Sequence, residues 1–211
     1  MFTCAECQVF ACYTGEPDRM PRNCPMLDES SKKVIEESCR EYKDDNLVFA
    51  RQAALIESKG YCQSTRVQEV IHFCREMGYQ KIGIAFCNGL RREAAVFAKI
   101  LRSHGFEVVS VTCKNGSVPK STLLKIKNEE QCFPGRYEAM CNPVGQAMLL
   151  NHAQTHFNVA VGLCVGHDSL FFKYSQAPVT VLIAKDRVLA HNPAGALYCA
   201  EGFYRRKVFP E

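Results

Sequence analysis

Four cysteines near the start of the chain have the spacing of a metal site. They read C-x2-C-x4-C-x11-C and are Cys4, Cys7, Cys12 and Cys24. A C-x2-C turn lets two thiolates bind one ion, and four sulfur ligands suit zinc or an iron–sulfur cluster. Residues 1–28 are also rich in glycine and proline, so they cannot build a hydrophobic core and need a cross-link such as a metal. We predict zinc or a [4Fe-4S] cluster here, and the alternative is a disordered tail with reactive thiols.

Three further cysteines each follow an apolar run that is typical of a β-strand. Cys87 follows the run at 81–86, Cys113 follows the run at 107–112, and Cys164 follows the run at 158–163. In open α/β sheets, ligands bind outside the carboxyl ends of the strands. Neighbouring strands lie about 5 Å apart, so we expect these thiols to gather at one edge and share a metal or cluster.

A fourth ligand for this second site can come from the loop between the second and third strands. Cys132 and Cys141 both lie there, and we favour Cys141. It precedes Asn142-Pro143, which begins a helix, and a helix amino terminus favours a thiolate. Packing in the core or a redox-active thiol pair is the alternative for the strand-end cysteines.

Other cysteines fit the hydrophobic core better than a site, because free cysteine is often buried as a small apolar residue. Cys39 and Cys74 fall on apolar faces of expected helices, and Cys62 and Cys199 look similar.

Several polar residues and glycines lie beside the strand-end cysteines. His167 follows Cys164 closely and is a candidate acid–base group or ligand, whereas Asp168 is a candidate cap for a helix that starts at Ser169. Backbone amides at the expected turns can approach an anion or a cluster sulfide, or the turns serve only to reverse the chain. These candidate cofactor-binding residues are Asn88, Gly89, Asn115, Gly116 and Gly166.

The elements that must position these residues alternate between helices and strands. Helical patterns occupy 32–42, 45–59, a segment opened by Ser64-Thr65, 90–104, 119–127 and 143–155; strand patterns occupy 81–86, 107–112, 158–163 and 179–184. Such alternation indicates parallel βαβ units. We expect an α/β fold with a mostly parallel four- to five-stranded sheet flanked by helices. Residues 1–28 form the metal-binding module, and 29–211 form a three-layer domain with a helical N-terminal part.

Composition narrows the classes of function. The chain has 211 residues, thirteen cysteines and a formal charge of +4, with both signs of charge mixed along it. We expect no nucleic-acid partner and no membrane span. The start of the sequence lacks the pattern of a signal peptide, so we expect a cytoplasmic protein. Cytosolic thiols stay reduced, which favours metal or redox chemistry over disulfides.

The chain resembles the bacterial and archaeal family catalogued as domain of unknown function 1847, whose members are often described as metal-binding proteins. The resemblance rests on segments throughout the chain: CAECxxxxC at 4–12, NCPM at 23–26, AFCNGL at 85–90, VTCKNGS at 111–117, MCNPVGQA at 140–147, VGLCVGHDSLF at 161–171, APVTV at 177–181 and AHNPAGALY at 190–198. The resemblance favours the same two cysteine sets, and Cys132 lies outside its motifs. It also implies that iron–sulfur is favoured over zinc at the strand-end site.

Three hypotheses on function follow. The first is a protein that binds zinc or an iron–sulfur cluster and has a redox-related role, in which it passes electrons to a protein partner. The second is an enzyme or small-molecule sensor that uses a strand-end Cys/His pocket with His167 as base, while the amino-terminal metal is structural. A third, less favoured reading is an adaptor whose zinc module docks another macromolecule.

Overall fold

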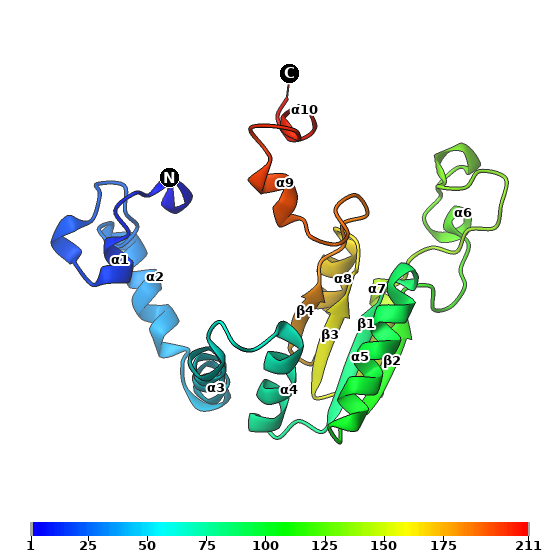
Figure 1. Cartoon of the computed structure of the whole chain (residues 1–211), viewed down its shortest axis with the longest axis horizontal. Helices are drawn as coiled ribbons and strands as arrows, with labels where there is room; N and C mark the ends of the chain where they lie inside the picture. Colours follow the sequence, from blue (N-terminus) through cyan, green and yellow to red (C-terminus); the bar gives the residue numbers. More distant parts are fainter. Residues whose placement is uncertain (1, 211) are drawn as a thin grey trace. The chain divides into compact units, whose positions relative to one another are not determined.

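The structure is a computed structural model that describes residues 2–210 (Figure 1). It divides into two compact units, one ending at Lys59 and one beginning at Gly60. The first unit therefore contains the cysteine-rich segment together with two long helices. The cysteine-rich module of residues 1–28 stays a prediction as a metal-binding domain.

The first unit is built from short turns followed by two helices. Its elements are η1 (Cys4–Glu6), α1 (Ala11–Thr14), η2 (Pro17–Arg19), α2 (Glu29–Arg40) and α3 (Asp44–Gly60). Helix α2 begins at Glu29, before the helical pattern predicted at 32–42, because the Asp28 carboxylate accepts a hydrogen bond from the Ser31 amide at 2.9 Å. An aspartate at this position satisfies a free amide of the first turn.

The second unit carries a four-stranded, all-parallel sheet in the order β2-β1-β3-β4. Its elements are α4 (Arg66–Glu76), β1 (Lys81–Phe86), η3 (Asn88–Leu90), α5 (Arg91–Ser103), β2 (Glu107–Thr112), α6 (Lys120–Leu123), η4 (Asn128–Glu130), α7 (Pro143–His152), β3 (Phe157–Val161), α8 (His167–Tyr174), β4 (Val179–Ile183), α9 (Ala194–Tyr198) and α10 (Arg205–Val208). The expected α/β fold with a parallel sheet is thus confirmed.

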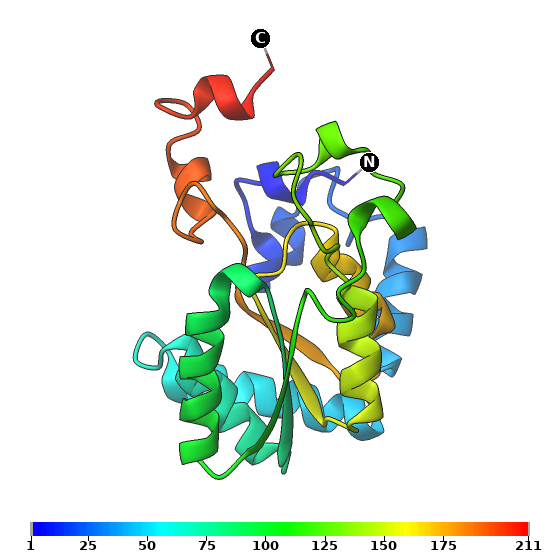
Figure 2. The same ribbon diagram turned by 90° about the vertical axis from the view of Figure 1, so that its right-hand side faces the viewer.

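Helices cover both faces of this sheet, and Figure 2 shows α5 and α7 on opposite sides of it. On one side, Ala147, Leu150 and Phe171 from α7 and α8 pack on Ala85 and Ala160 in a buried cluster. On the other side, α4 and α5 bury their apolar faces: Val70, Ile71, Phe73, Cys74, Ala94, Phe97, Ala98 and Leu101. Each face of the sheet therefore contributes to a hydrophobic core.

The order of the strands creates a switch point between β1 and β3. The chain passes from β1 to β2 on one side and then returns to place β3 on the other side of β1. The strands end level with one another, because Phe86 is opposite Thr112 on β2 and opposite Val161 on β3. Residues that follow these strands consequently meet at one edge, and α/β proteins bind ligands in the crevice at such a point.

Of the four cysteines expected in the core, only Cys74 is buried. Cys39, Cys62 and Cys199 are exposed, so the core prediction was wrong for them. Within residues 2–210, no helix combines the length and the apolar character needed to cross a bilayer.

Candidate functional site

Backbone hydrogen bonds carry the sheet one residue beyond the strand ends. The Cys87 amide donates to the Val161 carbonyl at 3.1 Å, and the Cys113 amide donates to the Phe86 carbonyl at 2.8 Å. Cys87 and Cys113 therefore sit side by side at the carboxyl edge of β1 and β2, as predicted from the sequence.

Three thiols meet at this edge. The Cys113 thiol lies within hydrogen-bonding reach of the thiols of both Cys87 and Cys141, and Cys113 itself is buried. The Asn88 amide also donates to the Cys113 sulfur at 3.3 Å. We refer to Cys87, Cys113 and Cys141 as the thiol triad. Cys141, favoured over Cys132 from the sequence as the fourth metal ligand, thus lies beside Cys113, and its role as a ligand stays a prediction.

Hydrogen bonds among the three thiols lower the pKa values of Cys87 and Cys141 and raise the pKa of Cys113. The Cys113 thiol lowers the pKa of Cys87 to about 4, against burial and with help from the Gly89 amide and Lys185. The same thiol lowers the pKa of Cys141 to about 5, again against burial, with further help from Lys114 and His167. The pKa of Cys113 is raised, because its proton is held by Cys141 and Cys87 and because it is buried. The outer two sulfurs are thus the thiolates at neutral pH.

A pair of asparagines holds Cys141 beside Cys113. The Asn142 amide donates to the Cys113 carbonyl at 2.7 Å. The Asn115 side chain donates to the Thr112 and Asn142 carbonyls at 2.9 and 3.0 Å, and the Asn142 side chain donates back to Asn115 Oδ1 at 3.1 Å. Asn142 also caps α7 by accepting from the Gly145 amide at 2.9 Å. We refer to these contacts as the asparagine clasp.

A buried glutamine on α7 ties the strand ends together beneath the triad. The Gln146 side chain is fully buried, and its Nε2 donates to the Phe86 carbonyl at 3.1 Å and to the Val111 carbonyl at 2.7 Å. Phe86 and Val111 lie at the carboxyl ends of β1 and β2, just before Cys87 and Cys113. Gln146 therefore fixes the separation of the two strands at that point.

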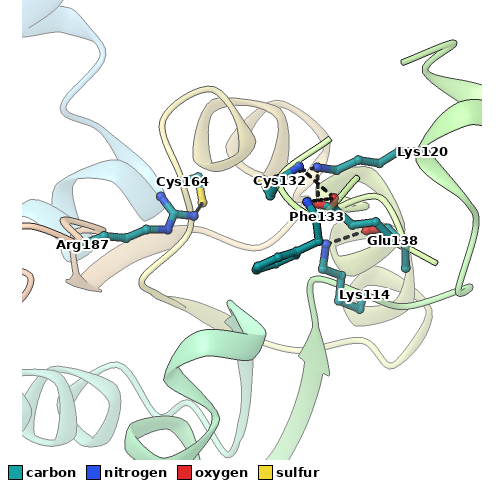
Figure 3. A network of polar contacts seen from close by, with 8 residues as sticks. Lys114, Lys120, Cys132, Phe133, Glu138, Cys164 and Arg187 are labelled. Carbon is teal, nitrogen blue, oxygen red and sulfur yellow. Dashed lines mark hydrogen bonds and ion pairs between the residues drawn. The ribbon is translucent and has the colours of Figure 1, made fainter. Parts of the chain in front are cut away.

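The remaining strand-end cysteine, Cys164, has a different partner. Arg187 Nη2 contacts the Cys164 sulfur at 3.0 Å, and this contact raises the pKa of the Arg187 guanidinium (Figure 3). Lys185 lies at Cys87: a Cβ added to Gly89 would be 3.4 Å from Lys185 Nζ and 3.8 Å from Cys87 Sγ. The residues after β4 therefore fold back over the ends of β3 and β1.

Sequence reasoning missed Lys185 and Arg187. A signal was available, because both residues come directly after the fourth strand and so at the same carboxyl edge as the cysteines. Lys114 was also missed although it follows Cys113 directly; its ammonium donates to the Ala139 carbonyl at 2.6 Å.

Cys132 lies in the excursion between β2 and α7, in an ion-paired setting. Lys120 forms an ion pair with Glu138, and its Nζ is 3.9 Å from the Cys132 sulfur. The Glu138 carboxylate also accepts from the amides of Cys132 and Phe133 at 3.0 and 3.4 Å. Figure 3 shows this network. The network fixes the path of the chain between β2 and α7, and Cys132 remains exposed.

The remaining candidates from the sequence occupy varied positions. Asn88 and Gly89 offer amides to the triad, whereas the Asn115 side chain serves the clasp. Gly116 and Gly166 have positive φ of 80° and 81°, a backbone geometry that glycine adopts without strain. Gly166 precedes α8, which begins at His167 rather than at Ser169, so the predicted helix start after an Asp168 cap was wrong. His167 lies close enough to Cys141 to lower its pKa.

In the first unit, the four cysteines of the amino-terminal motif line one hollow of about 400 Å³. The Phe10 amide points at the Cys7 sulfur at 3.5 Å, and the amides of Phe10 and Val9 lower the pKa of the Cys7 thiol. This is the amide-to-sulfur arrangement expected of a C-x2-C turn. Cys4, Cys7, Cys12 and Cys24 therefore converge on one space in the fold.

The donor chemistry of both cysteine sets fits a thiophilic metal, since zinc and iron–sulfur clusters take thiolate ligands. Across residues 2–210, however, no three His, Cys, Asp or Glu side chains are arranged so that they would hold a metal ion together. The triad consists of pairwise thiol contacts centred on Cys113. The metal sites predicted from the sequence stay predictions.

Comparison with known proteins places these features in a family. Residues 24–182 match the family described as "Protein of unknown function (DUF1847)". A relative from Methanocaldococcus jannaschii, described as an uncharacterized protein, is 47% identical over 205 residues, which cover 97% of each chain. The family match includes Cys24, the thiol triad and Cys164, and it ends before Lys185 and Arg187. The chain belongs to the DUF1847 family.

Proposed function

We propose that the carboxyl edge of the sheet binds a metal centre, an iron–sulfur cluster or zinc, and that the protein has a redox-related role. The thiol triad supplies three ligands, and Cys164 at the end of β3 supplies the fourth. The observation that carries the proposal is the reach of the Cys113 thiol to both Cys87 and Cys141. Sulfurs from three separate parts of the chain are thereby brought together at a fold's usual ligand-binding edge.

The surroundings of the sulfurs support this function. Thiolates bound to a metal are stabilised by amide donors and by nearby positive charge. The Asn88 amide donates to Cys113, and Lys185 and Arg187 contact Cys87 and Cys164. An iron–sulfur cluster with four thiolates carries net negative charge, so these cations favour a cluster over a neutral ligand.

The amino-terminal hollow is the second predicted site, for zinc or a [4Fe-4S] cluster, with Cys4, Cys7, Cys12 and Cys24 as ligands. Because its thiols lie in a turn-rich segment with little buried apolar surface, a bound metal would stabilise that segment. This part of the proposal makes the first unit a metal-dependent module and the second unit a separate metal site.

The test is a set of single Cys→Ser variants of the full chain, purified without oxygen and analysed for iron, acid-labile sulfide and zinc. We expect Cys87→Ser, Cys113→Ser and Cys141→Ser each to lower the metal content, whereas Cys62→Ser, at an exposed cysteine outside both sets, keeps the wild-type content. Equal metal content in all four variants and the wild type would refute the strand-end site. A colourless wild type that contains zinc alone would exclude the iron–sulfur version.

A second candidate function is favoured by the position of His167 near the Cys141 thiolate. A thiolate of lowered pKa beside an imidazole suits a nucleophile in an enzyme or a reactive thiol in a sensor. The same variants separate the two functions. Under this alternative, Cys141→Ser removes reactivity toward electrophiles and leaves the metal content unchanged.

A further inference from the structure

The sheet edge at the switch point between β1 and β3 is bordered by two cations. Cys87 follows β1 and Cys164 follows β3, so these two cysteines flank this part of the edge. Lys185 reaches Cys87, and Arg187 reaches Cys164. Both cations come from the segment after β4, the edge strand, and lie over the place where a parallel sheet binds its ligand.

Neither cation is neutralised by a carboxylate. Among residues 2–210, the ion pairs of Lys and Arg with Asp or Glu involve other residues: Arg19, Lys32, Lys81 and Lys120. Asp186 lies between the two cations in sequence, but its carboxylate accepts from the amides of Val188 and Leu189 at 2.8 Å. The acidic side chain is therefore turned into the following loop, and the two basic side chains are left to face the sulfurs.

Both side chains keep hydrogen-bond donors free. A guanidinium has five N–H donors and an ammonium has three, and a contact with one sulfur uses only part of that capacity. Arg187 Nη2 makes the contact with Cys164, and Arg187 is exposed. The planar fork of a guanidinium matches the paired oxygens of a carboxylate or phosphate.

We propose that this edge of the sheet binds a small oxyanion, a compound that carries a carboxylate or phosphate group, through Arg187 and Lys185. The anion would lie beside the cysteines of the proposed metal centre, so the inference deepens the proposed function by naming the class of its substrate or effector. It rests on the proposed function for the identity of the site, and the two can fail separately, as the experiment below shows.

The experiment titrates the full chain, purified without oxygen, with inorganic phosphate and in a separate run with oxalate, using calorimetry. The variants are Arg187→Gln and Lys185→Gln, with Arg187→Lys as the conservative replacement. Lys99→Gln is the matched control, because Lys99 is exposed on α5 and its loss changes the net charge by the same amount. Metal content is measured on the same samples.

We expect saturable binding of at least one anion by the wild type. Arg187→Gln and Lys185→Gln should each weaken it by about tenfold or more, the effect of losing a hydrogen bond to a charged group. Arg187→Lys should recover part of the affinity, and Lys99→Gln should bind as the wild type does. No saturable heat with either anion, or equal affinity in the wild type and both Gln variants, overturns the proposal. A wild type that binds the anion but contains no metal instead overturns the proposed function.

Discussion

Gly145 on α7 allows a direct test of how the cysteines are positioned. A Cβ added at Gly145 would overlap the Asn115 amide oxygen and would lie 2.8 Å from Asn142 Cγ. Gly145→Ala should therefore displace the asparagine clasp that joins residue 115 to residue 142. In an ordinary helix the same change stabilises a protein by about 0.5–1 kcal/mol, because alanine is the better helix former.

The size of the effect follows from the contacts at risk. The side chains of Asn115 and Asn142 contribute four of the clasp's hydrogen bonds, at 2.9–3.1 Å. Losing two or three of them at about 1 kcal/mol each costs about 2–3 kcal/mol. After the gain in helix propensity, a net loss of about 1–2.5 kcal/mol remains. In a protein of this size, each kcal/mol lowers the melting temperature by about 2–4 °C.

The assay is chemical or thermal unfolding followed by circular dichroism. The matched control is Gly195→Ala in α9, where an added Cβ would meet Leu189 at an ordinary 3.6 Å, so this variant should be neutral or slightly stabilised. Asn115→Ala removes the overlapping oxygen, and adding Gly145→Ala to it should cost less than Gly145→Ala alone. If Gly145→Ala unfolds at or above the wild-type temperature, the clasp does not hold α7 to the end of β2 as we argue.

Two further predictions concern acidity. In metal-free protein, alkylation of Cys141 by iodoacetamide should persist at pH 6 and fall as the pH drops through about 5, because its thiolate is present above its lowered pKa. Cys74, whose burial raises its pKa to about 12, should stay unmodified in the native state. Equal rates of alkylation at Cys141 and Cys74 would contradict this assignment. Glu138→Gln should speed limited proteolysis within the excursion between β2 and α7, since the Lys120 ion pair is lost, whereas Glu129→Gln on the exposed η4 should not. The Glu138 pKa is lowered by Lys120. The wild-type excursion should therefore resist proteolysis above the ordinary carboxyl pKa and become susceptible only as the pH falls through the lowered value. Equal rates of proteolysis in Glu138→Gln and Glu129→Gln would show that the ion pair is dispensable.

The sheet was predictable because its strands depend on local pattern. The runs at 81–86 and 107–112 match β1 and β2 residue for residue, since both are short apolar segments between clear stops. Helix α4 begins as expected because Thr65 and Gln68 form a capping box. The third strand was predicted to reach Leu163, but it ends at Val161, because Gly162 takes a positive φ of 64° with its backbone against Leu90.

The candidate site was predictable to the extent that it follows from strand ends. The meeting of Cys87 with Cys113 depends on parallel strands that finish level, and the approach of Cys141 depends on a helix start. The contacts of Lys185 and Arg187 were not predictable, because they depend on how the segment after β4 folds back. The role of Asn115 was also missed, since its partner Asn142 is 27 residues away in the sequence.

The bridge made by Gln146 has a consequence for selectivity. A fully buried amide that joins one helix to two neighbouring strands makes the spacing of the sulfurs above it stiff. If the sheet edge binds a metal centre as we propose, that centre would have to fit the separation of the sulfurs that the backbone sets. The turn-rich amino-terminal segment could instead shift its sulfurs to fit metal centres of different size. On the proposed function, the sheet edge would therefore be the more size-selective of the two cysteine sets.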